Sequence, residues 1–219
     1  MDAIILAGGV GKRAKLNIPK QLMRIGGIPI LIRVLKLFSY INMFENFIIT
    51  VPSDIYYYND LINSYDIKNF KCIIGGETRQ ESVYLALQHV ESERVIIHES
   101  ARPFITKQHI LDLISIDKPS VVPCIHIIPT IFHKDGKFVK RDELLNVQLP
   151  QVFDSDLLLL AHRNAIGKNY SDDSSLLFEE LGILPTIVNG LEENFKITTP
   201  LDCKLAEVLY EEVSSSDRW

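Results

Sequence analysis

The chain has 219 residues, of which 47% are hydrophobic and 23% are charged, and its formal net charge is −5. This length and composition predict a soluble globular protein, and we expect residues 1–219 to form a single domain. A mildly acidic chain without a run of lysine or arginine lacks the charge pattern of proteins that bind nucleic acid or anionic membranes.

The sequence predicts the cellular compartment through features that it lacks: a signal peptide, a membrane span and a disulfide pattern. No signal peptide precedes the first predicted strand, and no apolar run approaches the ~18 residues of a membrane span. The cysteines Cys72, Cys124 and Cys203 are odd in number and widely separated, which argues against a disulfide framework or a zinc site. We therefore expect a cytoplasmic protein.

Strand and helix patterns alternate along most of the chain. Strands are predicted at 3–6, 46–51, 70–74, 94–98, 120–123 and 184–188, and helices at 28–38, 54–64, 80–90, 105–116, 154–164, 173–181 and 200–212. In the first helix, Leu31, Val34, Leu35 and Phe38 recur at the spacing of one helix face. This alternation predicts an α/β fold with a doubly wound, mostly parallel sheet and helices on both faces.

Residues 125–150 interrupt the alternation. Two short β-prone runs, 130–133 and 138–139, flank a turn that contains Asp135-Gly136, and Asp-Gly is a strong local signal for a hairpin. We expect a protruding β-hairpin arm here. A hairpin of this size cannot bury a core of its own, so the arm is predicted to pack against a second copy of the chain in a homodimer.

The most informative segment follows the first strand. It runs Ala7-Gly8-Gly9-Val10-Gly11-Lys12-Arg13 and is followed by Pro19-Lys20-Gln21. A glycine-rich turn lets backbone N–H groups approach a polyphosphate, and Arg13 and Lys20 supply positive charge. The spacing excludes a P-loop, which would need glycine at position 6 and Ser or Thr at position 13, and it excludes the G-x-G-x-x-G dinucleotide fingerprint. What remains resembles the turn of nucleotidyltransferases that act on sugar and polyol phosphates.

Three later clusters also follow predicted strands, where open α/β sheets bind their ligands. They contain Arg79 and Ser82, then Glu99 and Ser100, and finally Lys196. Some of these residues have a plainer interpretation: Arg79 and Ser82 equally suit a helix start, and Glu99 suits a solvated strand end. As a ligand, Glu99 suits Mg²⁺, which favours one or two carboxylates together with substrate phosphates. The convergence of the clusters indicates a site for a phosphorylated ligand.

Seven motifs in a fixed order carry a closer resemblance. Between residues 2 and about 207 they are L-A-G-G-x-G-x-R, P-K-Q, G-G-x-x-R-x-x-S-V, H-E-S-A-R-P, R-x-x-L-x-x-x-Q-L-P-Q, D-D-x-S and N-F-K-I-T-x-P-x-D. This series resembles the 2-C-methyl-D-erythritol 4-phosphate cytidylyltransferase family and the related ribitol 5-phosphate cytidylyltransferases. The resemblance implies an enzyme that transfers CMP from CTP to one of these polyol phosphates and releases pyrophosphate.

The resemblance also implies roles for individual residues. Arg13 and Lys20 would hold the CTP phosphates and Glu99 would bind Mg²⁺, while Arg141, Ser171 and Lys196 would grip the acceptor phosphate. Catalysis would rest on Arg13, Lys20, Arg141 and Lys196. The nucleotide would be surrounded by Ala7, Gly8, Gly9, Gly11, Arg79, Ser82 and Ser100. The arm at 125–150 would form the homodimer, with Arg141 completing the acceptor site of the other subunit.

The chain departs from the family pattern at four positions. Glu99 stands where the family usually has aspartate, Leu149 and Ser171 where it usually has threonine, and Ala14 where methionine is frequent. Leu149 cannot hydrogen-bond a substrate. The departures therefore bear on the identity of the acceptor more than on the use of CTP. Two alternatives stay open: a sugar-phosphate nucleotidyltransferase that uses another nucleoside triphosphate, and a nucleotide-binding relative without turnover.

Overall fold

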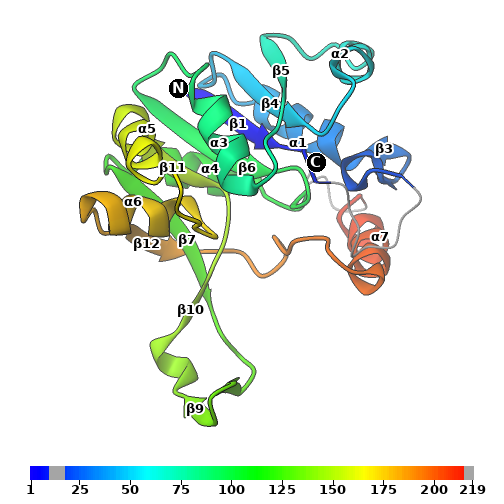
Figure 1. Cartoon of the computed structure of the whole chain (residues 1–219). Coiled ribbons are helices and arrows are strands. Elements are labelled where there is room, and N and C mark those ends of the chain that lie inside the picture. Colours follow the sequence, from blue (N-terminus) through cyan, green and yellow to red (C-terminus); the bar gives the residue numbers. More distant parts are fainter. Residues whose placement is uncertain (10–17, 215–219) are drawn as a thin grey trace.

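The computed structural model describes residues 1–9 and 18–214, with side chains up to residue 211 (Figure 1). Within this part of the chain, the main sheet has eight strands. They are β1 (Asp2–Leu6), β4 (Phe47–Val51), β5 (Phe70–Ile74), β6 (Arg94–Glu99), β7 (Ser120–His126), β10 (Leu145–Val147), β11 (Gln151–Asp154) and β12 (Thr186–Asn189). Their order is β10-β7-β11-β6-β1-β4-β5, and β12 pairs with β7.

The sheet is mixed but mostly parallel, which confirms the predicted fold class. Strands β6, β1, β4 and β5 are parallel neighbours, and β12 is parallel to β7, whereas β10 and β11 run antiparallel to their partners. The register places Leu6 opposite both Thr50 and Glu99. Leu6 and Glu99 are the last residues of their strands and Thr50 is the last but one of β4, so the loops after these parallel strands meet at one edge of the sheet.

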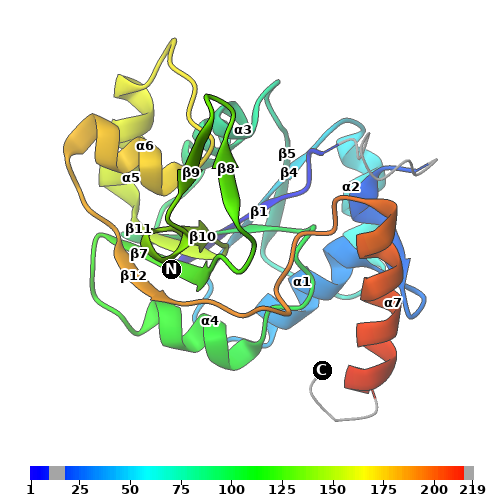
Figure 2. The same cartoon turned by 90° about the horizontal axis from the view of Figure 1, so that it is seen from below.

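Helices cover both faces of the sheet, as predicted (Figures 1 and 2). On one face, α1 (Ile30–Ser39), α2 (Ile55–Asn63) and α4 (Lys107–Ile114) share a core with Ile5 and Ile49. On the other face, α3 (Arg79–Leu87), α5 (Ser155–Asn164) and α6 (Asp173–Leu181) pack with Ile4 and Ile48. Successive strand residues point to opposite faces, so these neighbouring isoleucines divide between the two layers. None of the described helices combines the length and apolar character needed to cross a bilayer.

Polar side chains fix the starts of five helices. Asp54, Thr78, Thr106, Asp154 and Asp172 each accept a hydrogen bond from a backbone N–H in the first turn of α2, α3, α4, α5 and α6. Such caps satisfy N–H groups that have no partner inside the helix. These helices begin within two residues of their predicted starts.

Two elements differ from the sequence-based expectation. The first helix begins at Ile30 instead of 28, because β3 (Ile28–Pro29) pairs with β2 (Arg24–Ile25) in a small hairpin. β11, a buried strand that lies between β6 and β7, is not predicted from the sequence. Its four residues run directly into α5 with no turn residue between them, so the chain carries no local signal for a separate strand there.

A third apolar cluster fixes the segment that precedes α7 (Pro200–Ser214). The cluster joins the β2–β3 hairpin to α7 and contains Met23, Ile25, Ile30, Phe104, Ile197 and Ala206. The backbone N–H of Ile197 also donates to the carbonyl of Ala101, 2.9 Å away, in the turn after β6. The residues around Ile197 are therefore held against the carboxyl edge of the sheet.

The predicted hairpin arm is confirmed. It consists of β8 (Ile131–His133) and β9 (Lys137–Val139), and it projects from the sheet, followed by the 3₁₀ helix η3 (Arg141–Glu143) and β10 (Figure 1). Gly136 in its turn has a φ of 89°, a left-handed conformation that glycine adopts without strain. Phe132 and Phe138 pair across the hairpin with ring centroids 5.0 Å apart, and they are 57% and 76% exposed.

Candidate active site

Two cavities lie side by side at the carboxyl edge of the parallel strands. The smaller, of about 300 Å³, is lined by the loop after β1, the 3₁₀ helix η2 (Lys20–Leu22) and the start of α3. The larger, of about 690 Å³, lies between the turn after β6, the start of α6 and the base of the arm. Arg79, Glu99 and Lys196 line both cavities. We call these three residues the junction, because ligands in the two cavities would meet there.

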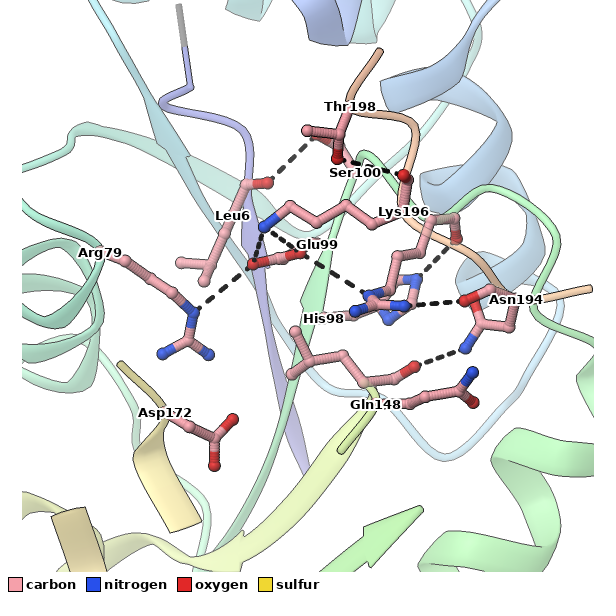
Figure 3. Close-up of polar contacts among 12 residues, drawn as sticks. Leu6, Arg79, His98, Glu99, Ser100, Gln148, Asp172, Asn194, Lys196 and Thr198 are labelled. Carbon is pink, nitrogen blue, oxygen red and sulfur yellow. Dashed lines mark hydrogen bonds and ion pairs between the residues drawn. The ribbon is translucent and has the colours of Figure 1, made fainter. Parts of the chain in front are cut away.

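Glu99 lies at the centre of the junction (Figure 3). Its carboxylate oxygens are 2.9 Å from Lys196 Nζ, 3.5 Å from Arg79 Nε and 3.7 Å from Arg102 Nε. Burial tends to raise the pKa of this carboxyl, but Lys196, Arg79 and Arg102 outweigh that effect, and the pKa lies below its usual value. Glu99 is therefore ionised at neutral pH.

Arg79 connects the junction to a second carboxylate. It is the first residue of α3, and its Nη2 donates to Asp173 Oδ2 across 2.6 Å. Arg79, Arg102 and Lys196 carry three positive charges, and the carboxylates of Glu99, Asp172 and Asp173 lie among them, so the cluster is close to neutral. A phosphorylated ligand would find three cationic donors here.

Lys196 is held in place by the buried residues on either side of it. The Asn194 side chain donates to the Leu149 carbonyl across 2.5 Å, and Ile197 is anchored to the turn after β6. Both Asn194 and Ile197 are fully buried, whereas the Lys196 side chain is partly exposed to both cavities. The segment between β12 and α7 therefore presents one lysine to the junction.

The loop after β1 forms one wall of the smaller cavity. Gly8 and Gly9 line this wall, and a Cβ atom on Gly9 would meet none of the described atoms within 4 Å. Ala7 is buried, and its N–H already donates to a carbonyl of β4. Ser100 also lines the cavity, and its N–H and Oγ both donate to the Leu6 carbonyl, at 3.0 and 3.1 Å (Figure 3). The wall thus offers backbone groups and little side-chain bulk.

The turn before α3 forms the opposite wall. A Cβ atom on Gly75 would lie 2.9 Å from Ser82 Oγ, so the turn packs closely on the helix. Ser82 Oγ accepts from the Gly76 N–H at 3.0 Å and donates to the Thr78 carbonyl at 2.8 Å. Ser82 therefore fixes the turn at the helix start and also lines the cavity, which agrees with both interpretations of this residue.

The comparison with known families decides the class of protein. A family model described as 2-C-methyl-D-erythritol 4-phosphate cytidylyltransferase matches residues 1–212. The chain belongs to this family. The enzyme of that name from Phocaeicola vulgatus is 36% identical over 214 residues, which are 94% of this chain and 97% of the relative. The one from Geobacillus thermodenitrificans is 36% identical over 219 residues, or 95% and 96% of the two chains.

Solved structures agree with this family membership. The 2-C-methyl-D-erythritol 4-phosphate cytidylyltransferase from Thermus thermophilus has a TM-score of 0.79 and 26% identity, over 96% of this chain and all (100%) of that one. The bifunctional IspDF from Campylobacter jejuni has a TM-score of 0.83 and 28% identity over 93% of this chain. The match covers 53% of the bifunctional chain, so this protein spans about half its length.

The structure brings some, but not all, of the residues predicted for this cytidylyltransferase-family site together. Lys20, Gly8, Gly9, Arg79, Ser82 and Ser100 line the smaller cavity, and Ser171 lines the larger one, with Glu99 and Lys196 at the junction. Gly11 and Arg13 fall within 10–17, outside the described residues, so their roles stay predictions.

Arg141 lies apart from the cavities of its own chain. It belongs to η3 on the arm, where its Nη1 donates to the Ile128 carbonyl across 2.6 Å and its Nε is 3.7 Å from Asp142 Oδ1. Arg141 is not among the described residues that line either cavity, and its side chain is 51% exposed. The single chain therefore does not place this arginine beside Lys196.

Arg102 is a site residue that was not predicted from the sequence, although it lies in the motif H-E-S-A-R-P. Its Nη1 donates to the Asn194 carbonyl across 2.8 Å, its Nε faces Glu99, and it lines the larger cavity. The signal that could have found it is its position three residues after Glu99. A tight turn brings residues at that spacing together.

The larger cavity has one charged end and one apolar wall. Arg79, Arg102 and Lys196 form the charged end together with the carboxylates of Glu99 and Asp172. The wall includes Ile125, Ile127, Ile128, Pro129, Leu145, Val147 and Leu149. Leu149, where the family usually has threonine, belongs to this wall, and its side chain is buried in the core against α5 and α6. The cavity therefore suits a ligand with one anionic end and some apolar surface.

A buried hydrogen bond holds the turn that carries Lys20. The Gln21 side-chain amide donates to the Tyr58 hydroxyl across 2.6 Å, and both residues are almost completely buried. Tyr58 comes from α2, so this bond ties η2 to the helix layer beneath it. Lys20 is the residue directly before Gln21, and its position in the smaller cavity depends on the same turn.

We expect Tyr58→Phe to lower the free energy of unfolding by about 1–3 kcal/mol, because it leaves the buried Gln21 amide without its acceptor. Tyr57→Phe is the matched control, since Tyr57 is a half-exposed neighbour on the same helix and should change stability by less than about 0.5 kcal/mol. Urea unfolding of both variants checks the prediction. Equal stabilities for the two variants would show that the bond does not hold the turn.

Proposed function

We propose that the chain transfers CMP from CTP to 2-C-methyl-D-erythritol 4-phosphate and releases pyrophosphate. The observation that carries this proposal is the pair of cavities that share Arg79, Glu99 and Lys196 in a chain of this family. CTP would occupy the smaller cavity and the polyol phosphate the larger one. The α-phosphate of CTP and the phosphate of the acceptor would then meet at the junction.

This reaction needs no general base. A phosphate monoester has a second pKa near 6, so it is already a nucleophilic anion at pH 7. One of its oxygens forms a bond to the α-phosphorus of CTP, while the bond between that phosphorus and the pyrophosphate oxygen breaks in line. The obstacle is the repulsion between two anions. Catalysis therefore rests on positioning and on positive charge where the negative charge develops.

Each group of residues has one task in this proposal. Lys20 and Arg13 bind the CTP phosphates, while Ser171 and Lys196 bind the phosphate of the acceptor. Lys196 also faces the developing charge, because it lines both cavities. The nucleotide contacts come from Ala7, Gly8, Gly9, Gly11, Arg79, Ser82 and Ser100.

At the junction, Mg²⁺ would share the Glu99 carboxylate with Lys196, Arg79 and Arg102. No three His, Cys, Asp or Glu side chains among the described residues gather into a metal cage. Mg²⁺ commonly takes one or two carboxylates and completes its shell with phosphates and water, and Glu99 is an ionised carboxylate that faces both cavities. Glu99 would therefore hold the ion beside the CTP phosphates. When bound, Mg²⁺ neutralises charge on those phosphates.

Glu99→Asp is expected to lower the Mg²⁺ concentration that gives a half-maximal rate. The longer glutamate has to retract to reach an ion that aspartate, the usual residue in the family, would reach directly. A titration of the rate with Mg²⁺ measures this concentration. Glu180→Asp is the control, since it shortens a carboxylate that pairs with Lys168 outside both cavities. If Glu99→Asp leaves the Mg²⁺ requirement unchanged, Glu99 does not bind the metal and only forms ion pairs with its neighbours.

The apolar wall of the larger cavity supports the methylated acceptor over ribitol 5-phosphate. 2-C-Methyl-D-erythritol 4-phosphate carries a methyl group on its polyol chain, whereas ribitol carries none. Burying a methyl group against Ile125 or Val147 is favourable by about 0.8 kcal/mol per carbon. The three cations at the other end would hold the phosphate of either acceptor.

The arm supports a homodimer within the same proposal. Its exposed Phe132 and Phe138 offer apolar surface to a second copy, and Arg141 lies on the arm away from the cavities of its own chain. We infer that Arg141 serves the acceptor site of the partner. Residues 1–219 would act as one domain with an arm at 125–150, in the cytoplasm.

A panel assay tests the proposed function. Pyrophosphate release is measured for CTP, ATP, GTP and UTP, each with 2-C-methyl-D-erythritol 4-phosphate or ribitol 5-phosphate. Release is expected with CTP and the methylated acceptor. Faster release with ribitol 5-phosphate would overturn the acceptor, and faster release with another triphosphate would overturn the nucleotide. CTP binding by calorimetry without any release would identify a relative without turnover.

A further inference from the structure

We propose that Asp173, supported by His162, is a positioning residue that holds Arg79 at the junction of the two cavities. This inference rests on the proposed function and adds two buried residues to it, neither of which lines a cavity among the described residues. The relevant contacts join three helices: Arg79 comes from α3, His162 from α5 and Asp173 from α6.

Arg79 is placed between two carboxylates, and Asp173 is the closer one. Arg79 Nη2 lies 2.6 Å from Asp173 Oδ2, whereas Arg79 Nε lies 3.5 Å from Glu99 Oε1. Short hydrogen bonds between ionised partners are about twice as strong as neutral ones. The guanidinium is therefore held mainly by Asp173, a buried carboxylate that lines neither cavity.

Asp173 has a second polar neighbour on its other side. Its side chain is 1% exposed, and its Oδ1 lies 3.3 Å from Nε2 of the fully buried His162. The imidazole of His162 stacks against Tyr84 of α3, with 14° between the ring planes. Burial tends to raise the pKa of Asp173, but Arg79 and His162 outweigh it, so the pKa lies below its usual value.

The start of α6 does not require this carboxylate. Asp172, the preceding residue, already caps the helix by accepting from the Ser174 N–H across 2.9 Å. A buried ion pair also contributes little net stability, because desolvation offsets the attraction between the charges. The task left for Asp173 is to direct Arg79.

Without Asp173, the guanidinium would turn fully towards Glu99. It would then compete with Lys196, whose Nζ lies 2.9 Å from the same carboxylate. Asp173 therefore does two things: it keeps Arg79 available to both cavities, and it leaves Glu99 to Lys196. Displacements of about 1 Å at a reacting centre can cost up to 10²-fold in rate.

A double-mutant cycle tests this proposal. Asp173→Asn is expected to lower kcat about 10- to 100-fold with less change in the KM for CTP, because the junction acts where the two phosphates react. In an Arg79→Gln background, Asp173→Asn should lower kcat no further. The control is Asp154→Asn, which removes a capping carboxylate at α5 away from both cavities and should leave kcat unchanged.

Unfolding measurements on the same variants make the test independent of turnover. Arg79→Gln should destabilise the fold by leaving Asp173 buried and unpaired, and adding Asp173→Asn should restore stability. If Asp173→Asn lowers kcat by the same factor with and without Arg79, Asp173 is a structural residue and the proposal is overturned. If the wild-type protein shows no turnover in the panel assay, the proposed function fails, and stability restored in the double variant still supports the Arg79–Asp173 pairing.

Discussion

Replacing Lys20 by alanine is expected to lower kcat by about 10²- to 10³-fold without unfolding the protein. Lys20 lines the smaller cavity, where the CTP phosphates would lie. Burial raises the pKa of Asp202 at the start of α7, but hydrogen bonds from Thr199 and Thr198 and the nearby charge of Lys20 outweigh it, so the pKa lies below its usual value. Removing a charge that stabilises a reacting phosphate raises the barrier and leaves the fold intact.

Lys68→Ala is the matched control for this variant. Lys68 is an exposed lysine whose Nζ lies 3.8 Å from Asp66, far from both cavities, and its loss should leave kcat unchanged. Rates are measured at saturating CTP and acceptor, with circular dichroism to confirm folding. If Lys20→Ala turns over at the wild-type rate, the smaller cavity is not the phosphate site.

Mixing two inactive variants is expected to restore about a quarter of the wild-type activity. If the arm carries Arg141 into the site of the partner, each active site takes Lys20 from one chain and Arg141 from the other. Lys20→Ala and Arg141→Ala chains, unfolded and refolded together in equal amounts, give about half mixed dimers by random pairing. Each mixed dimer then has one intact site and one site with both lesions.

The mixing experiment has a second possible outcome, in which no activity returns. If Arg141 serves its own chain, every site in the mixture keeps one lesion and no activity returns. Mass spectrometry of the intact dimers confirms that mixed species formed, and each variant refolded alone gives the background rate. No recovery with confirmed mixed dimers would rule out the shared site and leave the cytidylyltransferase proposal standing.

The sequence predicts most of the sheet because its strands are separated by helices with their own start signals. Strands 70–74 and 94–98 are found to within one residue, since each is a short apolar or β-prone run that ends at polar residues. The same logic misses β11, which is antiparallel and runs into α5 without a turn. A strand whose identity depends on neighbours far along the chain has no local signal.

The site residues that can be predicted from the sequence are those that come soon after a predicted strand. Gly8, Gly9 and Lys20 follow strand β1 along the chain, so the sequence places them at the ligand edge directly. Asp173 is harder to find, because its role depends on Arg79 from another helix. Arg102 lies only three residues after Glu99, and its role there depends on the tight turn between them. The proposed role of Arg141 is in the acceptor site of a second chain. Neither the sequence nor the structure of a single subunit can therefore show that role.

In the proposed reaction the two substrates react across the junction, and the fate of a label shows whether they do. CTP labelled with ³²P at the α-phosphorus is mixed with excess protein and 2-C-methyl-D-erythritol 4-phosphate, and the products of a single turnover are separated. We expect the label to move into a cytidine diphosphate ester of the polyol and the pyrophosphate to be unlabelled. Label recovered as free CMP would mean that water attacks in place of the acceptor, which would contradict an acceptor site in the larger cavity.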